Sequence, residues 1–510
     1  MKRVFFVECA GSIWRTVAQH CIDKEQWQPV LWTAQHADAL PIAKMFPEVL
    51  FLAGTDAALG LPDASAPWPM PALDADFLEA LASVESIALH MMDRMDPACG
   101  TGFSHDDRRR HYHRLLRYWA GALNALKPDL IVFSIAPHVV FDYILFALAR
   151  HRGIPTVMLE RIGLPGWVFP MSDFEQGSVQ LRKHLQEQPV VKLAQVPPAF
   201  RTWLEAASEG GAAVPANFQK KLERYKLGTS AQMPSLPRAL LHEFKRAIVL
   251  LRRYGMQPAL NAYLRSQRFP HGHANHLETL LSRLRGLFAK RKLLRIHDEL
   301  SSSPIDGENY VLLALHYQPE RATVPMGGAF GDQTLIVDML ASSLPPGWKL
   351  YIKEHPWQLQ SFGRGEVQRT EAFYAEITRR PEAMLLPRQI STAAMVRGAR
   401  AVATVTGSVG WDALCSGIPV LTFGAAWYRD CEGVYRIRNQ ADLTNAMNRI
   451  LSGERPQPET TIAFCAALAT VCVEGVLEPD LERTEHLSQG DAASSMAETL
   501  MNFDHGDSCP

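Results

Sequence analysis

The sequence predicts an α/β fold with two Rossmann-like domains and a helical insertion between them. The chain has 510 residues, and a single hydrophobic core stops growing at about 250 to 300 residues, so two large domains are expected. Short apolar runs alternate with helical patterns in residues 1–190 and again in residues 306–460, whereas residues 191–305 carry helical patterns alone. Residues 461–510 are expected to form C-terminal helices and a tail.

The first block contains four short apolar runs that are typical of buried strands. They lie at residues 4–7, 30–32, 130–133 and 156–159. A helical pattern over residues 139–150 separates the last two runs. A strand, a helix and a second strand in this order predict a parallel sheet with right-handed crossovers.

The second block repeats this alternation. Its expected strands lie at residues 310–315, 349–352, 383–386, 401–405 and 420–423, with 383–386 as a short edge strand. In doubly wound sheets of this kind, ligands bind at the carboxyl ends of the strands. The polar residues that follow these strands are therefore the first candidates for a site.

The composition excludes several classes of protein. The chain is 47% hydrophobic and 21% charged, with a formal net charge of -1, which is typical of a soluble globular protein and argues against a nucleic-acid partner. No apolar run reaches the roughly 20 residues that a transmembrane helix needs. The eight cysteines form no CxxC pair, so we expect reduced thiols in a cytoplasmic protein and no zinc site.

Two expected helices of the insertion are basic, at residues 244–253 and 283–295. Such helices are commonly solvated faces. The alternative is a surface for anionic lipid or an anionic glycan, which would bring the protein into peripheral contact with the inner membrane. Amphipathic patterning does not separate the two interpretations.

Three strand ends of the second domain carry polar residues that could meet in one crevice. The candidates are His316, Gln318 and Glu320 after the first strand, Lys353, His355 and Pro356 after the second, and Thr406, Gly407 and Ser408 after a later one.

The turn at 406–408 has small residues, two hydroxyls and a following helix, which together suit a phosphate group. Lys353 would add positive charge and His355 a hydrogen-bond donor, and Pro356 would fix the backbone as it leaves the strand. The alternative is an ordinary helix cap at Ser408.

The first domain offers candidates for acid–base chemistry. His138 and Asp142 stand four residues apart after one strand, and Glu160 ends the next. A carboxylate at such a position could act as a general base, or as a nucleophile toward an anomeric carbon. Glu8, at the end of the first strand, is a weaker candidate. The alternatives are a local ion pair of Glu160 with Arg161 and a surface position for Asp142.

Two acidic patterns are expected to mark helix starts and not metal sites. One is the DxD of residues 74–76, which precedes an apolar helical pattern. The other is the run at residues 104–113, where the histidines and acids are interleaved with arginines. No metal site is expected in this chain.

At these residues the sequence resembles the capsule polysaccharide biosynthesis family of bacterial glycosyltransferases, which includes transferases of 3-deoxy-manno-octulosonic acid (Kdo) that use CMP-Kdo. The resemblance covers about residues 130–165 and 310–430. The segments that carry it are HYQPE at 316–320, KEHP at 353–356, TGSVGWDAL at 406–414, GIPV at 417–420 and FG at 423–424.

The resemblance implies a GT-B architecture, with the nucleotide in the C-terminal domain and the acceptor near the N-terminal one. It implies a metal-independent transferase without a cofactor, active in capsular, O-antigen or lipopolysaccharide assembly. Its donor would be CMP-Kdo or another CMP-activated acidic sugar, and its acceptor a glycan or glycolipid. The sequence leaves inversion or retention at the anomeric carbon open.

Two rival functions remain from the sequence. One is a CDP-glycerol-type polyol-phosphate transferase, in which a Ser-rich turn is followed by an Asp four residues on, as Ser408 and Asp412 stand here. The other is a non-catalytic GT-B-like assembly protein that acts through its basic helices. Nucleotide binding would distinguish both enzymes from the scaffold.

Overall fold

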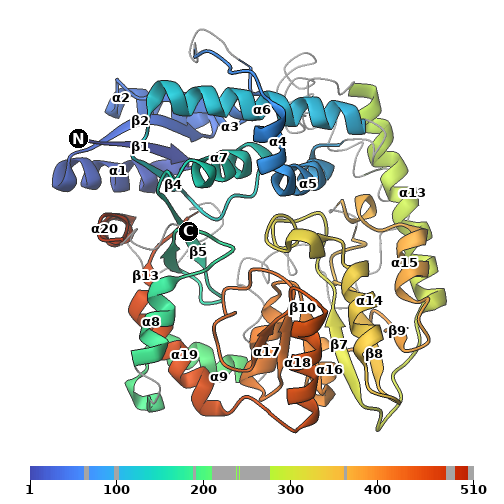
Figure 1. Cartoon of the computed structure of the whole chain (residues 1–510). Coiled ribbons are helices and arrows are strands. Elements are labelled where there is room, and N and C mark those ends of the chain that lie inside the picture. Colours follow the sequence, from blue (N-terminus) through green and yellow to red (C-terminus); the bar gives the residue numbers. More distant parts are fainter. Residues whose placement is uncertain are drawn as a thin grey trace.

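The computed structural model contains two β-sheets with helices on their faces (Figure 1). It describes residues 1–61, 68–96, 103–187, 191–208, 276–360, 364–477 and 489–503, together with the single residues 237 and 241. The two sheets confirm the predicted α/β class with two Rossmann-like domains. The predicted domain boundaries stay predictions.

The first sheet has the strand order β13-β6-β5-β4-β1-β2-β3. Its strands are β1 Lys2–Val7, β2 Trp27–Ala34, β3 Leu50–Ala53, β4 Leu130–Phe133, β5 Thr156–Arg161, β6 Trp167–Met171 and β13 Val473–Glu474. The pairs among β1 to β5 are parallel, whereas β6 is antiparallel to both β5 and β13. The sequence did not predict β3, β6 or β13.

Both faces of this sheet are buried, because successive side chains of a strand point to opposite faces. In β1, Phe5 and Val7 pack into one apolar cluster, and Val4 and Phe6 into another. The helices and short turns of this half are α1 Gly11–Glu25, η1 His36–Asp38, α2 Ala39–Met45, α3 Gly54–Leu59, α4 Ala75–Ala80, α5 Ala82–Met91, η2 Met92–Met95, α6 His105–Leu126 and α7 Val140–His151.

The two expected helix starts of this half are confirmed. The Asp74 carboxylate accepts from the N–H of Phe77 at the start of α4. The Ser104 hydroxyl accepts from the N–H of Asp107 at the start of α6. Both acidic patterns therefore cap helices.

The second sheet is entirely parallel, in the order β12-β11-β10-β7-β8-β9. Its strands are β7 Tyr310–Ala314, β8 Lys349–Lys353, β9 Ala383–Leu385, β10 Ala401–Thr404, β11 Val420–Thr422 and β12 Val434–Arg436. The elements around it are α13 His276–Leu300, η4 Gly328–Gly331, α14 Thr334–Ser343, η5 Gly365–Val367, α15 Glu371–Ile377, α16 Thr392–Gly398, α17 Ser408–Cys415 and α18 Gln440–Leu451. The predicted edge position of β9 is confirmed.

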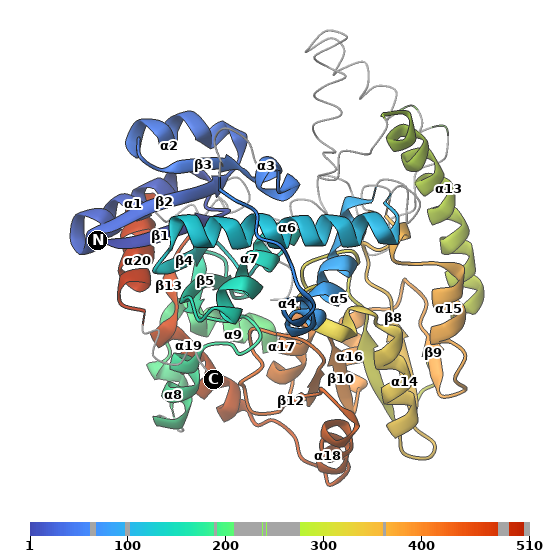
Figure 2. The same cartoon turned by 45° about the horizontal axis from the view of Figure 1, so that its top comes forward.

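The C-terminal part of the chain returns to the first domain. The elements that join the halves are α8 Val179–Glu187, η3 Leu193–Gln195, α9 Pro198–Ser208, α19 Pro458–Val471 and α20 Gln489–Met501. α19 packs against α8 and α9, β13 extends the first sheet, and α20 lies on α1 (Figure 2). On α9, the Trp203 ring stacks on Trp411 of α17, with centroids 5.2 Å apart. An apolar cluster thus runs from one domain into the other.

Little of the predicted helical insertion is described. The basic stretch at 244–253 lies outside the described residues. The second basic stretch, at 283–295, lies in α13. In α13, Lys290 is buried and its ammonium lies 3.2 Å from the Glu366 carboxylate of the second domain. Lys292 forms an exposed ion pair with Glu371. Lys290 therefore packs inside the protein and does not belong to a solvated or lipid-facing surface, which corrects that part of the expectation.

No helix in the described ranges is both long enough and apolar enough to cross a membrane. Six cysteines lie in the described part of the chain, and all six are free thiols. Five of the six are buried.

Candidate functional site

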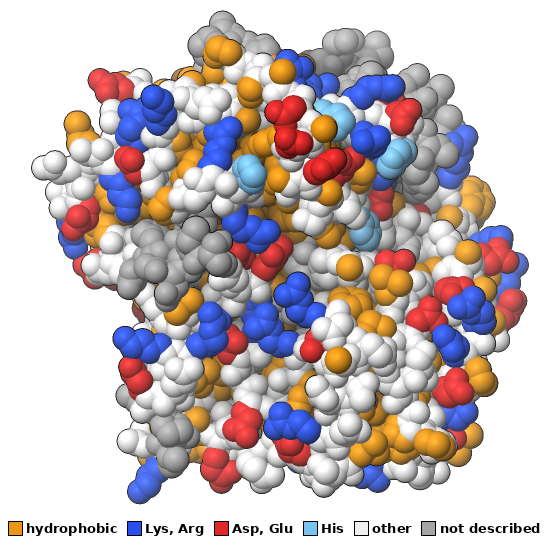
Figure 3. All heavy atoms as spheres, viewed as in Figure 1, with side chains coloured by type: hydrophobic (Ala, Val, Ile, Leu, Met, Phe, Trp, Pro, Cys, Tyr) orange, Lys and Arg blue, Asp and Glu red, His pale blue; other side chains and the backbone are white. Residues whose placement is uncertain are grey.

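The carboxyl ends of strands from the two sheets meet between the domains. Glu160 lies near the end of β5, and Arg321 follows β7 in the other domain. The Arg321 guanidinium donates to both carboxylate oxygens of Glu160, at 2.8 and 3.0 Å. On the face drawn in Figure 3, Lys and Arg side chains gather across the middle of the molecule, between the two halves. A ligand at these strand ends would contact both domains.

His316 connects the end of β7 to the turn after β10. Its Nε2 accepts from the backbone N–H of Thr406 at 3.0 Å and lies 3.1 Å from the Thr404 hydroxyl. That hydroxyl accepts from the N–H of Gly407 at 3.2 Å. Burial lowers the pKa of His316 to about 3, so the imidazole is neutral and carries its proton on Nδ1. The expectation that these two strand ends converge is confirmed by these distances.

The turn itself leaves no room for a side chain at Gly407. A Cβ there would lie 2.7 Å from Thr404 Oγ1 and 3.1 Å from His316 Nε2. Gly407 is the N-cap of α17, and the exposed Ser408 is the first residue of the helix, so the expected cap at Ser408 is shifted by one residue. The Thr406 hydroxyl donates to the carbonyl of Ala322 at 3.0 Å. The first amides of a helix lack intrahelical partners and favour anions.

Lys353 does not direct its charge into this turn. Its ammonium donates to the carbonyls of Pro387 and Arg388, at 3.1 and 2.8 Å. These carbonyls follow β9, whereas the Thr406 turn follows β10 on the other side of β7. Burial lowers the pKa of Lys353 to about 8. The expectation that this cation serves a phosphate is corrected, because the ammonium holds the loop after the edge strand.

Glu354, for which the sequence analysis predicted no role, is a buried charged residue of this domain. Its carboxylate pairs with Arg369, with Nε 2.9 Å from Oε2, and it accepts from the Tyr374 hydroxyl at 2.9 Å. Both partners of the ion pair are nearly inaccessible to water. Although burial alone would raise the pKa of Glu354, the Arg369 charge and hydrogen bonds keep it below its ordinary value. The carboxylate is therefore ionised at neutral pH.

Gln318 belongs to the same buried network. Its side-chain oxygen accepts from Arg369 at 2.6 Å and from Gln333 at 2.7 Å. Its side-chain nitrogen donates to the Gly331 carbonyl, and its backbone is held by Gln358. The hydrogen-bonding capacity of Gln318 is thus used inside the domain. The structure places this predicted binding residue beneath the strand ends.

His355 and Pro356 lie at the outer edge of the network. Nδ1 of His355 accepts from the backbone N–H of Trp357 at 3.2 Å, so the proton of the neutral ring is on Nε2. Burial lowers the pKa of His355 to about 4. Pro356 is exposed. His355 thus keeps its Nε2–H as a hydrogen-bond donor in a fixed direction, as its predicted role in phosphate binding requires.

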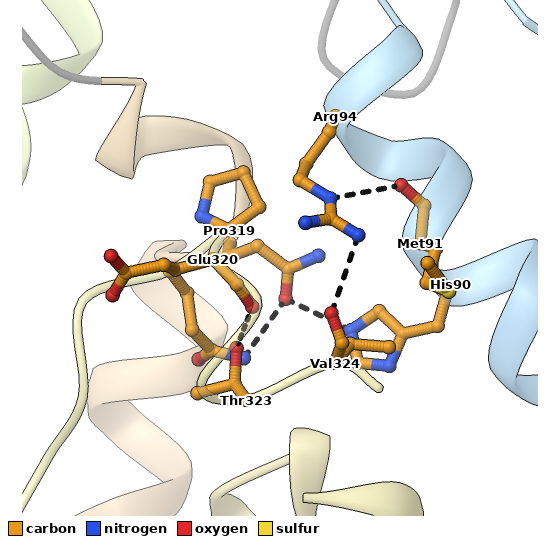
Figure 4. Close-up of a pocket in the computed structure, with 9 residues that line it drawn as sticks. His90, Met91, Arg94, Pro319, Glu320, Thr323 and Val324 are labelled. Atoms are coloured by element: carbon orange, nitrogen blue, oxygen red, sulfur yellow. Dashed lines mark hydrogen bonds between the residues drawn. The ribbon is translucent and has the colours of Figure 1, made fainter. Parts of the chain in front are cut away.

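Glu320 lines a small open pocket between the domains, which Figure 4 shows. Arg94 enters this pocket from η2 of the first domain. Its Nη2 donates to the Val324 carbonyl at 3.3 Å and its Nε to the Met91 carbonyl at 3.5 Å. No carboxylate of the described residues lies within salt-bridge distance of Arg94. The remaining lining residues are His90, Gln318, Pro319, Thr323 and Gln368.

The remaining catalytic candidates of the first domain lie just before and at the start of α7. The Asp142 Oδ2 accepts from the backbone N–H of His138 at 3.1 Å and lies 3.8 Å from the imidazole Nδ1. The Asp142 Oδ1 is buried with no hydrogen-bond partner in the described structure. Burial raises the pKa of Asp142 well above its ordinary value and lowers that of His138 to about 3. Asp142 is therefore a buried acid and not a surface one.

Glu160 is an ion-pair partner, but not of its neighbour. The local pair with Arg161 that the sequence left as an alternative is replaced by the pair with Arg321. Only the backbone N–H of Arg161 reaches Glu160, at 3.2 Å. A catalytic role for Glu160 stays a prediction, and it would require Arg321 to release the carboxylate.

Sequence reasoning missed the arginines that organise this region, Arg94, Arg321 and Arg369. Arg321 directly follows the quoted segment HYQPE, so its position could have been noted. Arg94 and Arg369 follow no predicted strand, and only the fold brings them to the strand ends. Within the described ranges, no group of three or more His, Cys, Asp or Glu side chains is arranged to hold a metal ion.

Comparison with known proteins gives one family. The family described as "Capsule polysaccharide biosynthesis protein" matches residues 230–469. These residues include α13, every strand of the second sheet and the turn at 406–408. No curated protein matches the chain.

Three of the solved structures that match the chain do so at low identity and low TM-score. One is KpsC from Thermosulfurimonas dismutans, described as a beta Kdo 2,7 transferase, with 14% identity and a TM-score of 0.24; the match covers 44% of this chain and 64% of KpsC, less than two thirds of its length. Another is UDP-GlcNAc 2-epimerase from Neisseria meningitidis, with 11% identity, coverage of 99% and 100%, and a TM-score of 0.22. The third is the glycosyltransferase SnogD from Streptomyces nogalater, with 12% identity, coverage of 92% and 100%, and a TM-score of 0.18.

Proposed function

We propose that this chain is a glycosyltransferase of bacterial surface-polysaccharide assembly, because its residues 230–469 match the capsule polysaccharide biosynthesis family. The donor in this proposal is a CMP-activated acidic sugar, Kdo or a relative, and the acceptor is a glycan or glycolipid. The transfer needs no metal ion or cofactor. The proposal is compatible with a role in the assembly of capsule, O-antigen or lipopolysaccharide.

The observation that carries the proposal is the turn between β10 and α17. His316 and Thr404 fix its backbone, and their close packing against Gly407 leaves no room for a side chain there. A phosphate bound here would accept hydrogen bonds from the first amides of α17 and from the exposed Ser408 hydroxyl. The Nε2–H of His355 is a further fixed donor after β8, which is separated from β10 by β7. Together these groups would stabilise a departing nucleotide phosphate without a metal.

An acidic sugar is supported by Arg94. Burial lowers the pKa of this arginine to about 10, with the charges of Asp142 and Glu320 opposing that shift. The guanidinium stays charged at neutral pH and still has donors to offer, because its two hydrogen bonds use only Nε and Nη2. A sugar carboxylate in the pocket of Figure 4 would receive a charge-assisted hydrogen bond from it.

A polyol-phosphate transferase that uses CDP-glycerol is the second candidate. Asp412 lies one helical turn after Ser408 on α17, and burial raises its pKa to about 7. Its Oδ1 is buried without a hydrogen-bond partner in the described structure. In either enzyme, Oδ1 would accept a hydrogen bond from a hydroxyl of the bound nucleotide or polyol. The identity of the donor substrate therefore has to be tested directly.

The test compares three donors on the full chain. We expect CMP-Kdo to raise the melting temperature and to be converted with release of CMP, while CDP-glycerol and UDP-GlcNAc have neither effect. Turnover of CDP-glycerol alone would establish the second candidate. Stabilisation by UDP and not by CMP would contradict the cytidine assignment, and no effect of any nucleotide would favour the assembly protein.

Two variants locate the nucleotide. Ser408→Ala and His355→Ala should each weaken CMP binding about tenfold, which corresponds to the loss of one charge-assisted hydrogen bond. The matched control is His184→Ala, which removes a partly exposed histidine of α8. Unchanged CMP affinity in both test variants would mean that the nucleotide binds elsewhere.

A further inference from the structure

The short turn η2 carries Arg94 into the pocket between the domains (Figure 4). Because η2 has only four residues, it has few hydrogen bonds of its own, and its position depends on the groups packed around it. The Arg94 guanidinium can reach a ligand in the pocket only while the turn is held in place. The contacts that hold η2 therefore decide what Arg94 can bind.

On the side of the first domain, Arg108 of α6 holds this turn. Its Nη1 lies 2.5 Å from the Asp93 Oδ1, and its Nη2 lies 3.2 Å from the Asp96 Oδ2. The Asp96 side chain is inaccessible to water, and hydrogen bonds between arginine and a carboxylate add geometric specificity as well as energy. Residues 93–96 are thus fixed to α6.

On the side of the second domain, the segment 364–369 contacts the same turn. The Arg364 guanidinium donates to the carbonyl of Arg94 at 3.3 Å and to the carbonyl of Asp96. Both acceptors are backbone atoms, so this contact fixes the path of the chain on either side of η2. Arg364 itself is not among the residues that line the pocket.

Gln368 holds η2 through its side chain and also lines the pocket. Its Nε2 donates to the Asp93 Oδ2, and its Oε1 lies 3.3 Å from the His90 Nε2. A carboxylate can only accept, so the amide nitrogen has to face Asp93, and the amide oxygen is left to accept from His90. An amide offers both functions, whereas a glutamate at position 368 would place a second carboxylate against Asp93.

The residue after Gln368 ties it to the nucleotide side of the second domain. Arg369 pairs with Glu354 at 2.9 Å, and the two side chains are only 0% and 2% exposed. The Glu354 Oε1 accepts from the backbone N–H of His355 at 2.8 Å, and His355 is a proposed donor to the nucleotide phosphate. Gln368 therefore joins η2 to a buried, fully hydrogen-bonded network.

We propose that Gln368 is a positioning residue that selects donors with an acidic sugar, because it holds η2 and so directs Arg94 at the sugar carboxylate. This inference rests on the proposed glycosyltransferase function and deepens it. Arg94 contacts the carboxylate, and Gln368 acts on it through the turn. CMP alone lacks this carboxylate, so its binding does not depend on Gln368.

A purely structural role for Gln368 makes a different prediction. If its side chain served only to hold the two domains together, its loss would weaken CMP and CMP-Kdo alike and would lower kcat as well. A role through Arg94 raises the KM for CMP-Kdo and leaves the Ki of CMP unchanged. It also has no effect once Arg94 has been removed.

The test measures CMP release from CMP-Kdo by the full chain, with water in place of the acceptor and a protein-free blank subtracted. Gln368→Glu should raise the KM for CMP-Kdo about tenfold, the size expected for one hydrogen bond to a charged group. The Ki of CMP and the kcat should stay near their wild-type values. Gln368→Ala adds no charge, so it tests the same contact if the glutamate prevents folding, and its KM should rise about fivefold.

A double variant identifies the route by which Gln368 acts. Arg94→Ala should raise the KM about 10- to 100-fold, because it removes the charged donor itself. Adding Gln368→Ala to Arg94→Ala should raise the KM no further, since the contact that Gln368 supports is already gone. Independent, multiplying effects of the two substitutions would overturn a role of Gln368 through Arg94.

The control is Gln440→Ala, which removes an exposed glutamine whose amide also donates to a side chain, the hydroxyl of Ser343. It should keep the wild-type KM and Ki. A wild-type KM in both Gln368 variants, or an equal rise in the KM and in the Ki of CMP, would overturn the inference and leave the proposed function standing. A wild-type protein that releases no CMP from CMP-Kdo would overturn the proposed function, and the inference with it.

Discussion

The two clusters of polar residues at the strand ends differ in how fully their hydrogen bonds are satisfied. In the second domain, Glu354, Arg369 and Gln318 use their polar atoms on one another and on the backbone. In the first domain, the Oδ1 of Asp142 is buried and has no hydrogen-bond partner among the described residues. Satisfied networks make a site rigid, whereas unsatisfied buried groups cost stability and are found where chemistry needs them. The second domain therefore holds the more rigid of the two clusters.

The largest effect should follow from breaking the satisfied network. Arg369→Met leaves the Glu354 carboxylate buried without its cation, which should cost about 3–5 kcal/mol of unfolding free energy. Chemical denaturation followed by circular dichroism would measure it.

Arg388→Met is the matched control, because Arg388 pairs with Asp298 at the surface, with side-chain exposures of 28% and 52%. Its removal should cost about 0–1 kcal/mol. Equal costs for the two variants would refute the distinction between a buried network and a surface pair.

The next effect concerns the turn that follows β10. His316→Ala removes the acceptor of the Thr406 N–H, which should cost about 1–3 kcal/mol and loosen the nucleotide site. We expect a lower melting temperature together with a CMP affinity reduced at least tenfold. If the affinity stayed at the wild-type value while stability fell, His316 would be a structural residue without influence on the ligand.

A smaller effect is expected for the ion pair between the domains. A double-mutant cycle with Glu160→Gln and Arg321→Met should give a coupling energy of about 1 kcal/mol, since the pair is bidentate but Arg321 is 23% exposed. Thermal unfolding of the wild type, the two single variants and the double variant supplies the four free energies of unfolding. Loss of turnover in Glu160→Gln with no coupling to Arg321 would instead restore Glu160 as a catalytic residue.

The smallest effect should be a gain in stability at the unsatisfied cluster. The pKa of Glu8 is raised to about 7 in the folded protein from an ordinary 4.5, so its protonated form stabilises the fold and this stability is lost as pH rises through that range. Glu8→Gln removes this loss of stability at high pH. Its melting temperature should exceed that of the wild type at pH 8, by a few degrees at most because Glu8 is only partly buried, and should match it at pH 4.

Melting curves recorded between pH 4 and pH 8 would show this directly. A constant difference across the whole range would mean that folding does not shift the pKa of Glu8.

The strands of both sheets could be predicted where apolar residues ran without interruption, as in residues 130–133 and 401–405. β6 is antiparallel to β5, which directly precedes it, and so departs from the predicted parallel alternation, whereas β13 pairs with β6 across a long separation in sequence. β13 has only two residues, and no local pattern identifies so short an element. The fold class therefore followed from periodicity, while the return of the C-terminus to the first domain did not.

The site was predictable to the extent that strand ends of a parallel sheet must converge. His316 and Thr406 met as expected. Lys353 did not join them, because the sequence does not show which neighbouring strand a terminal side chain faces. Glu354 and Arg369 are 15 residues apart without a shared motif, and their pairing depends on the tertiary fold. The same holds for Glu160 and Arg321, which come from different domains.

The most direct test of the central claim, a cytidine nucleotide site at the turn between β10 and α17, is a calorimetric titration of the full chain with CMP and with UDP. We expect one site for CMP and at least tenfold weaker affinity for UDP. The CMP affinity should fall in Ser408→Ala. It should not fall in Ser452→Ala, which changes an exposed serine at the end of α18. Binding of UDP in preference to CMP, or no binding of either nucleotide, would contradict it.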